Sequence, residues 1–195
     1  MTQKKYQIFV SSTKDDLVEE RKAIYETILD LGHIPSGMEW FPSSDFSQWE
    51  YITKQLETTD YVVLISAGRY GSIVPGEFIS WTEKEFDYCV SQEIPVLTFL
   101  IEDIDALPGN RIDSEHRTEL EAFRNKLSDG RLRGTYTTPD DLKAKVTSAL
   151  SNSFTDNPRA GWIRADEVDV TSGADMEEIK KQIDELKEST TIHII

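Results

Sequence analysis

Apolar residues along the chain fall into two alternating patterns, short continuous runs and longer stretches with helical spacing. The run Asp60–Ser66 is apolar between its ends without interruption, which is typical of a strand covered on both faces by helices. Earlier in the chain, Leu17, Ile24 and Ile28 fall on one stripe, and Gly32 follows where a helix should end. The pattern therefore predicts an amphipathic helix beside a buried central strand.

These strand and helix patterns alternate five times. The first helix is expected to begin in Ser11–Asp16, which offers hydroxyl caps and carboxylates, and Thr138 before Pro139 marks a later helix start. Such alternation predicts a parallel, doubly wound α/β sheet with right-handed crossovers, and five short strands favour the flavodoxin-like order. The expected strands are Tyr6–Val10, His33–Met38, Asp60–Ser66, Ile94–Ile101 and Leu132–Tyr136, and the expected helices are the segment ending at Leu31, Trp49–Thr58, Trp81–Ser91, Glu115–Leu127 and Pro139–Phe154.

The periodicity breaks at Asn157–Trp162, which predicts the end of an α/β domain over residues 1–165, with Trp162 covering an edge or packing back. Residues 166–175 are expected to be a linker. Beyond it, Met176, Ile179, Ile183 and Leu186 have the spacing of a short coiled coil within residues 176–195, and Thr190–Ile195 has the pattern of a terminal strand. That helix either folds back on the domain, self-associates, or contacts a downstream region of a truncated chain.

The charge balance restricts the partners. The chain has 21 Lys and Arg against 36 Asp and Glu, a net charge of −15, which repels a phosphate backbone and an anionic membrane surface. We therefore expect no nucleic-acid and no membrane partner. Cys89 is the single cysteine, so no internal disulfide can form, and neither a signal peptide nor an apolar run of membrane-spanning length is visible. A cytoplasmic location is the expectation.

In an open parallel sheet the ligand crevice lies at the carboxyl ends of the strands where the strand order reverses, here between the first and third strands. Two loops are expected there. One is Ser11-Ser12-Thr13-Lys14, a hydroxyl-rich segment before a helix that suits an anion or simply caps the helix. The other is Ala67–Ser72, where Arg69 offers charge and Tyr70 a stacking face, and whose glycines suit close approach or only a turn. No GxGxxG or GxxxxGK[ST] motif accompanies them.

The helix beginning at Trp81 carries an acid in an unusual place. At about 100° per residue, Glu85 projects into the middle of an apolar arc, whereas Glu83, Lys84 and Asp87 lie on the opposite, solvated side. A carboxylate in an apolar arc needs a polar partner, a cleft or a shifted pKa. Glu85 is thus either a functional acid or a structural group that bonds backbone amides or Arg69.

Cys89 and the histidines suggest no second chemistry. Cys89, one turn after Glu85, has the pattern of a buried small side chain rather than a nucleophile. His33, His116 and His193 lie in different elements, without metal-ligand or nucleophile–base spacing.

Several segments resemble a known family. Tyr6–Ser12 is similar to the first strand of Toll/interleukin-receptor (TIR)-like domains, and Ser80–Phe86 resembles their Ser-Trp-Cys-x-x-Glu-Leu helix start. The match covers roughly residues 4–165. The segments Phe9–Arg21, Gly37–Glu39, Asp60–Ser72 and Trp81–Pro95 are similar to a TIR-like domain of unknown function that often precedes signalling ATPase or repeat modules.

The resemblance implies a function. Some TIR domains cleave NAD at the nicotinamide–ribose bond, bacterial members act in defence against phage, and others only assemble through TIR–TIR contacts. By resemblance Glu85 is the catalytic glutamate, with NAD as substrate and no separate cofactor or metal. The resemblance further implies that Phe9 and Trp81 border the base and ribose, and that Ser11, Ser12, Thr13 and Arg69 face the diphosphate.

The sequence departs from the receptor-type pattern at two places. Thr82 stands where cysteine is common, and the aromatic loop Glu39–Ser47 lacks the usual Arg-Asp-x-x-Pro-Gly box. Two alternatives to an NAD-cleaving enzyme follow. The chain is either a non-enzymatic module that self-associates or recruits partners through its TIR surface and C-terminal helix, or an enzyme similar to nucleoside deoxyribosyltransferases, which also place a glutamate after the third strand.

Overall fold

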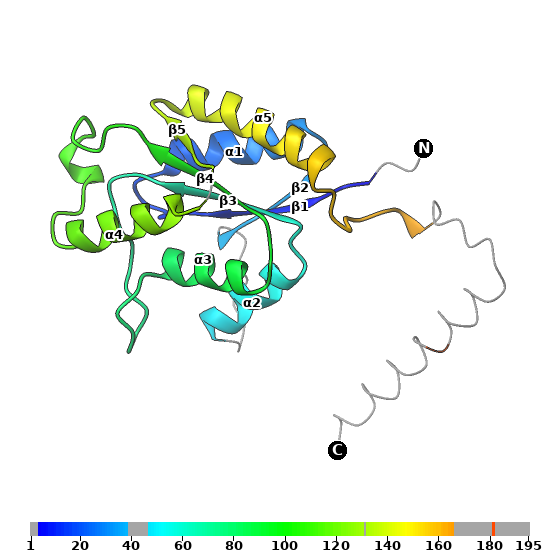
Figure 1. The fold of residues 1–195 in the computed structure, drawn as a ribbon, viewed down its shortest axis with the longest axis horizontal. Coiled ribbons are helices and arrows are strands. Elements are labelled where there is room, and N and C mark those ends of the chain that lie inside the picture. The colour runs from blue at the N-terminus through cyan, green and yellow to red at the C-terminus, as the bar shows by residue number, and fades with distance from the viewer. Residues whose placement is uncertain (1–3, 39–46, 131, 166–180, 182–195) are drawn as a thin grey trace, which may run out of the picture. The chain divides into compact units, whose positions relative to one another are not determined.

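Five parallel strands form the sheet, in the order β2-β1-β3-β4-β5 (Figure 1). This is the predicted flavodoxin-like order, with its reversal between β1 and β3, where Ile8 pairs with Tyr61 and Ser11 with Leu64. The strands are β1 (Gln7–Ser11), β2 (Ile34–Ser36), β3 (Tyr61–Ser66), β4 (Val96–Ile101) and β5 (Gly134–Tyr136).

The structure is a computed structural model that describes residues 4–38, 47–130, 132–165 and 181. The sheet and its helices belong to one unit, Lys4–Trp162; the rest of the chain forms a second unit. The predicted aromatic loop apart from Ser47, the linker 166–175, and the terminal helix and strand apart from Lys181 lie outside the described residues.

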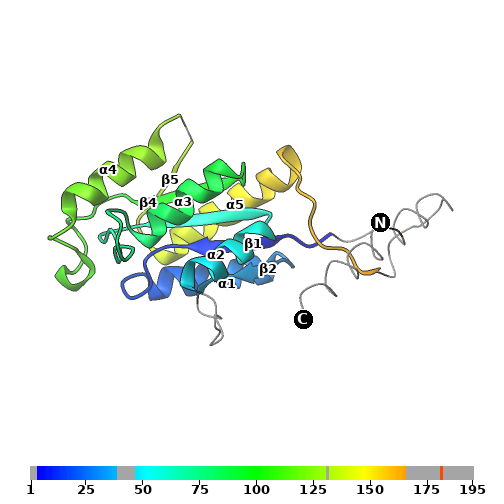
Figure 2. The same ribbon diagram turned by 90° about the horizontal axis from the view of Figure 1, so that it is seen from below.

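Helices cover both faces of the sheet (Figures 1 and 2). On one face α1 and α5 pack against each other, and α2, α3 and α4 lie on the other. Because both faces are covered, β3 is buried along its whole length, as its continuous apolar run predicted. The helices are α1 (Val18–Asp30), α2 (Gln48–Glu57), α3 (Trp81–Ser91), α4 (Arg117–Ser128) and α5 (Pro139–Asp156), with a short 3-10 helix η2 (Gly109–Arg111) between β4 and α4.

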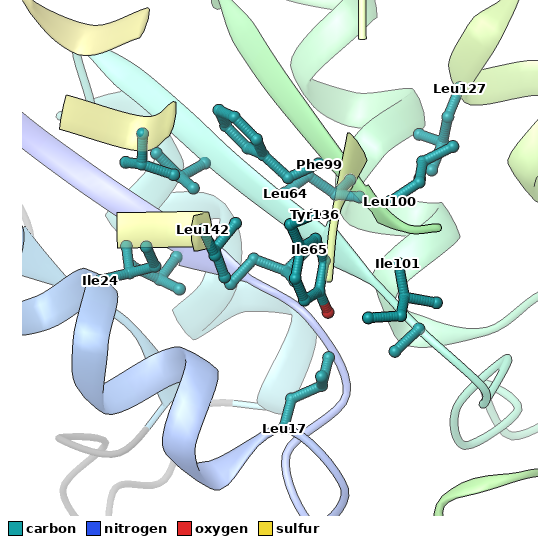
Figure 3. Close-up of a cluster of buried hydrophobic side chains, with 14 of the residues drawn as sticks. Leu17, Ile24, Leu64, Ile65, Phe99, Leu100, Ile101, Leu127, Tyr136 and Leu142 are labelled. Carbon is teal, nitrogen blue, oxygen red and sulfur yellow. The ribbon is translucent and has the colours of Figure 1, made fainter. Parts of the chain in front are cut away.

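The core follows from this layering. Figure 3 shows part of the larger cluster, in which Leu64 and Ile65 of β3, Leu100 of β4 and Leu142 of α5 come together. A smaller cluster on the other face joins Phe9 of β1 to residues of α2, β3 and α3. Burial of these side chains supplies the main stabilising free energy of the fold, at about 25 cal/mol per Å² of apolar surface.

Three helix starts and the end of α1 follow local capping chemistry. Ser47 and Glu50 form a reciprocal capping box at α2, and the hydroxyls of Ser80 and Thr138 accept backbone N–H groups at α3 and α5. Gly32, with φ of 81°, ends α1: its own N–H and that of the next residue bond back to carbonyls of the last turn, and glycine adopts this conformation without a Cβ clash.

The start of α1 differs from the prediction. The helix begins at Val18 after Leu17, which makes no side-chain capping bond, rather than in the hydroxyl segment Ser11–Asp16. The reason is tertiary: Ser11 belongs to β1, and its hydroxyl bonds a glutamate of another helix. The loop between β1 and α1 is therefore longer than expected.

At the end of the α/β unit the chain returns to its start. Trp162 pairs with Lys5 by two backbone hydrogen bonds of 2.6 and 2.8 Å, in an antiparallel bridge, so this segment packs back on the chain start. None of the helices in the described ranges is both long and apolar enough to cross a membrane.

Candidate functional site

A cleft of about 720 Å³ lies at the carboxyl ends of β1 and β3, the place where the strand order reverses. Most of its lining comes from three segments, the loop after β1, the loop after β3 with the start of α3, and the segment before α4, and Met38 and Gln48 complete it. The lining residues are Ser12, Thr13, Lys14, Asp15, Asp16, Met38, Gln48, Arg69, Gly71, Ser72, Ile73, Trp81, Thr82, Glu85, Ile112, Asp113, Ser114, Glu115 and His116.

Glu85 lies at the base of this cleft, as the helical spacing of α3 suggested. The Ser80 cap fixes where the helix begins, which turns Thr82, Glu85 and Cys89 inward. Glu85 is 2% exposed, and its Oε2 accepts a hydrogen bond of 2.5 Å from the Ser11 hydroxyl. Its Oε1 is buried and has no hydrogen-bond partner within the described part of the chain. One oxygen of the carboxylate thus has a hydrogen-bond donor, and the other has none within the described residues.

The environment of Glu85 changes its acidity. Burial raises the pKa of Glu85 to about 7, while the Ser11 hydroxyl and the positive charge of Arg21 act in the opposite direction. Near neutral pH the side chain therefore exchanges readily between carboxylate and acid. Acid–base and charge-stabilising groups of enzymes often have a pKa in this range.

The end of β1 is braced by a charged side chain of α1. Arg21 is buried, and its Nη1 donates to the Ser12 hydroxyl at 2.7 Å and to the Val10 carbonyl at 3.4 Å. The Ser12 hydroxyl in turn donates to the Thr13 carbonyl at 2.8 Å. Thr13 lines the cleft, and its Oγ1 has no partner in the described ranges. Of the predicted diphosphate contacts on this loop, Ser12 and Thr13 border the cleft, whereas Ser11 bonds Glu85.

The loop after β3 contributes Arg69 but not Tyr70. Arg69 borders the cleft, donates from Nη2 to the Asn110 carbonyl at 2.6 Å and leaves Nε unpartnered in the described structure. Tyr70 is buried: its hydroxyl donates to Glu83 at 2.5 Å and accepts the Ser80 N–H, so it offers no stacking face to a ligand. Its place is structural, beside the start of α3.

The two glycines of this loop are required by close packing. A Cβ at Gly68 would come within 2.4 Å of the Arg111 carbonyl oxygen, which belongs to the segment before α4. Gly71 has φ of 98°, and a Cβ there would meet the Thr13 methyl group at 3.0 Å. Both positions let the cleft-forming loops approach each other.

The two aromatic residues assigned to the base and ribose are separated in the structure. Trp81 borders the cleft and is half-buried, with the Lys84 ammonium 5.9 Å from its ring. Phe9 is fully buried in the smaller core cluster with Ile52 and Cys89 and does not line the cleft. The alternation of side chains along β1 explains this: Ser11 and Phe9 share one face, but only the strand end reaches the crevice.

Asp16 is a cleft residue that the sequence did not single out. It is 6% exposed, and both of its carboxylate oxygens are buried without hydrogen-bond partners in the described structure. Burial raises the pKa of Asp16, although the positive charges of Arg69 and Arg111 oppose this. In the sequence Asp16 resembled a helix-start carboxylate; only the late start of α1 places it at the cleft.

Comparisons with known proteins show the family of the chain. Residues 7–151 match the family described as a domain of unknown function, DUF4062. The chain belongs to the DUF4062 family. No curated protein matches the chain. Among solved structures, it is similar to the TIR domains in the structure of the activated Roq1 resistosome directly recognizing the pathogen effector XopQ, with 12% identity and a TM-score of 0.42, covering 78% of this chain and 92% of that one.

The prediction that Glu83 lies on the solvated side of its helix was wrong. Its side chain is only 13% exposed, not on a solvated face, because Lys126 of α4 bridges it at 2.8 Å and also contacts Asp87 at 2.6 Å. Together with the Tyr70 hydroxyl, these bonds tie α3 to α4 and to the loop after β3. They hold the helix that carries Glu85.

Two other reactive side chains of the domain, Cys89 and His33, do not border the cleft. Cys89 is buried in the smaller core cluster, where burial raises the pKa of its thiol to about 12, so it is not a nucleophile at neutral pH. His33 accepts the Tyr6 N–H at its Nδ1 and packs on Phe154. Within the described ranges, no group of three or more His, Cys, Asp or Glu side chains could hold a metal ion.

Proposed function

We propose that this DUF4062 domain is a TIR-like enzyme that cleaves NAD at the nicotinamide–ribose bond, in an immune or antiphage signalling role. Glu85 is the acting carboxylate. The observation that carries the proposal is the position of Glu85: a buried glutamate with one unsatisfied oxygen, at a cleft where the strand order reverses. The resemblance of Ser80–Phe86 to the TIR helix start supports the same residue.

The environment of Glu85 suits this reaction. When the bond between ribose C1′ and the pyridinium nitrogen breaks, its electron pair leaves with neutral nicotinamide, and positive charge develops on the ribose. A fixed carboxylate in a site of low dielectric constant stabilises that charge more than water does. Water then adds to C1′ and releases a proton, and Glu85, with a pKa of about 7, can accept it.

Other cleft residues fit the remaining parts of NAD. Thr13 and Arg69 border the cleft and offer a free hydroxyl and a positive charge for the diphosphate, and Trp81 offers an aromatic face for a base or ribose. Ser12 also borders the cleft, but its hydroxyl proton bonds the Thr13 carbonyl. A volume of about 720 Å³ lies within the range of about 300–1,000 Å³ usual for small-molecule sites.

The decisive measurement is nicotinamide release from NAD by the full chain, at protein concentrations spanning monomer and assembly. Glu85→Gln keeps the shape of the side chain and removes its charge. Exposed Glu102 provides the matched control, Glu102→Gln. We expect release by the wild type and the control and a loss of at least about 100-fold in Glu85→Gln. Equal rates in all three, no release at any concentration, or turnover of free deoxynucleosides instead of NAD would refute the proposal.

The second candidate is a non-enzymatic interaction module, and the covering of Glu85 favours it. The residue is 2% exposed and its free oxygen is shielded from solvent, as for a structural group. In this reading the TIR surface and the predicted helix Met176–Leu186 would mediate self-association or contact with a partner protein. Light scattering of the chain with and without residues 166–195 tests it: an unchanged mass at every concentration would count against that helix as an assembly element.

A further inference from the structure

We infer that Ser11 is a positioning residue for Glu85 and not a ligand of the substrate diphosphate. Ser11 holds one oxygen of the glutamate and leaves the other for the substrate. The inference rests on the proposed function for its consequence in catalysis, but the contact on which it depends is structural. It joins two elements 74 residues apart in the sequence.

The geometry commits the Ser11 hydroxyl to the glutamate. The side chain is 1% exposed, and its Oγ lies 2.5 Å from Glu85 Oε2. A serine hydroxyl has a single proton to donate. Once that proton bonds the carboxylate, only lone pairs remain, and these repel the oxygens of a phosphate. While Glu85 is ionised, Ser11 therefore cannot serve both the glutamate and an anionic ligand.

The surroundings keep this serine in place. Ser11 pairs with Leu64 in the sheet ladder, so its backbone belongs to the rigid part of the molecule. On the next residue, the Ser12 hydroxyl accepts from Arg21, which also bonds the Val10 carbonyl. The donor to Glu85 thus sits on a strand end braced on both sides. Groups held in this way can fix a reacting side chain within the narrow geometry that catalysis requires.

The contact also separates the two oxygens of Glu85 by role. Oε2 is used by Ser11, whereas Oε1 has no partner among the described residues. Oε1 is therefore the atom left to accept a ribose hydroxyl proton or to face the positive ribose carbon. A bond from Ser11 to the charged form also favours ionisation, opposing the effect of burial.

A titration of the Glu85 carboxyl carbon by 13C NMR tests the contact without any turnover. The full-length chain is labelled at glutamate side chains, and the signal is assigned by its loss in Glu85→Gln. In Ser11→Ala the favourable bond to the carboxylate is gone, so we expect the pKa of Glu85 to rise by about one pH unit. Ser11→Cys, with a similar size but a weaker donor, should fall between the two.

Ser66 supplies a matched control for the loss of a buried hydroxyl. It is buried at the carboxyl end of β3, as Ser11 is at the end of β1, but its hydroxyl has no hydrogen-bond partner within the described residues. Ser66→Ala should leave the titration of Glu85 unchanged. A Glu85 titration in Ser11→Ala that matches the wild type, or an equal change in Ser66→Ala, would overturn the inference.

Catalysis adds a second readout. If Glu85 acts as the carboxylate, the rise of NAD cleavage with pH should move upward by about one pH unit in Ser11→Ala, with a loss of about fivefold at pH 7 that is recovered near pH 9. If Ser11 instead binds the diphosphate, Ser11→Ala would raise KM at every pH without shifting the pH profile of NAD cleavage. This result would refute the inference. A changed NMR titration in a protein that does not cleave NAD would remove the proposed reaction and keep the contact.

Discussion

A buried carboxylate lies at each end of the sheet, and the two differ in how many of their oxygens have a hydrogen-bond donor. Asp60, at the amino end of β3, is 7% exposed, and its two oxygens accept backbone N–H groups of Gln7 and Gly161, both at 2.9 Å. Glu85, at the carboxyl end, has one hydroxyl donor and an oxygen without a partner in the described structure. Burial alone therefore does not show whether an acid has its hydrogen-bond donors within the fold.

The difference lies in what the acid is bonded to. A cavity of about 510 Å³ adjoins Asp60 as well, so the presence of a cavity does not decide the matter either. Asp60 ties the start of β1 to the segment that closes the domain, and each of its two carboxylate oxygens already has a backbone donor. At Glu85 one carboxylate oxygen has no donor within the described residues, so the free-energy cost of burying the side chain is not fully offset.

The largest expected effect is on turnover. Glu85→Gln should reduce NAD cleavage by at least about 100-fold, because the charge that stabilises the developing cation is gone. Asp60→Asn should leave turnover per folded molecule within about twofold, since it acts on packing at the far end of the sheet. Both are measured by nicotinamide release, normalised to the folded fraction from circular dichroism. Comparable losses in the two variants would break the contrast between the ends.

The next effect is on the stability of Asp60→Asn. The amide can accept only one of the two backbone N–H groups and directs its own donor at the other, so we expect a loss of about 2–3 kcal/mol in the free energy of unfolding. Urea titration at pH 8 measures it. Exposed Asp129 provides the control, and Asp129→Asn should change stability by less than about 0.5 kcal/mol. A stability for Asp60→Asn within that margin would show that the two bonds contribute little.

Glu85→Gln is expected to increase the free energy of unfolding, whereas Asp60→Asn decreases it. The pKa of Glu85 is about 7 in the folded state against 4.5 as its ordinary value, so the native protein binds a proton more tightly than the unfolded chain. The stability contributed by this group is complete below pH 4.5 and is lost as the pH rises through 7. At pH 8 Glu85→Gln should therefore gain about 2 kcal/mol over the wild type.

The same series of urea titrations contains the check on this prediction. At pH 4 the advantage of Glu85→Gln should disappear, since the wild-type side chain is then neutral in both states. A destabilised Glu85→Gln at pH 8 would place Glu85 with Asp60 among the structural acids.

The smallest effect concerns the pH dependence of the wild type. If the carboxylate form of Glu85 acts, cleavage of NAD should rise about tenfold between pH 6 and pH 8, because the ionised fraction changes by that factor around a pKa of about 7. A rate that is flat over this range, measured at saturating NAD, would assign the working charge to another group or place the limiting step elsewhere.

Much of the fold could be predicted because it depends on local pattern. α3 begins and ends where the sequence placed it, at Trp81 and Ser91, since Ser80 is a strong cap and the apolar spacing is regular. The central position of β3 followed from its uninterrupted apolar run. The start of α1 could not be predicted, because the hydroxyls of Ser11 and Ser12 can either cap a helix or bond side chains distant in the sequence, and the sequence does not show which bonds form.

The site divides in the same way. The inward orientation of Glu85 was visible in the helical spacing, because it depends on residues within one turn. The partners of Ser11, the core position of Phe9 and the burial of Tyr70 against Glu83 were not, because each depends on a contact between separate elements. Asp16 was missed for the same reason.

By itself the sequence determined the alternation of strands and helices, the edge of the sheet at which the cleft lies, and the inward-facing glutamate of α3, all of which follow from backbone periodicity and local capping. Only the tertiary structure decided how that glutamate is bonded. The contact from Ser11 crosses 74 residues, and whether a buried acid is satisfied depends on the donors that folding brings to it. At Asp60 folding supplied two such donors, and at Glu85 it supplied one.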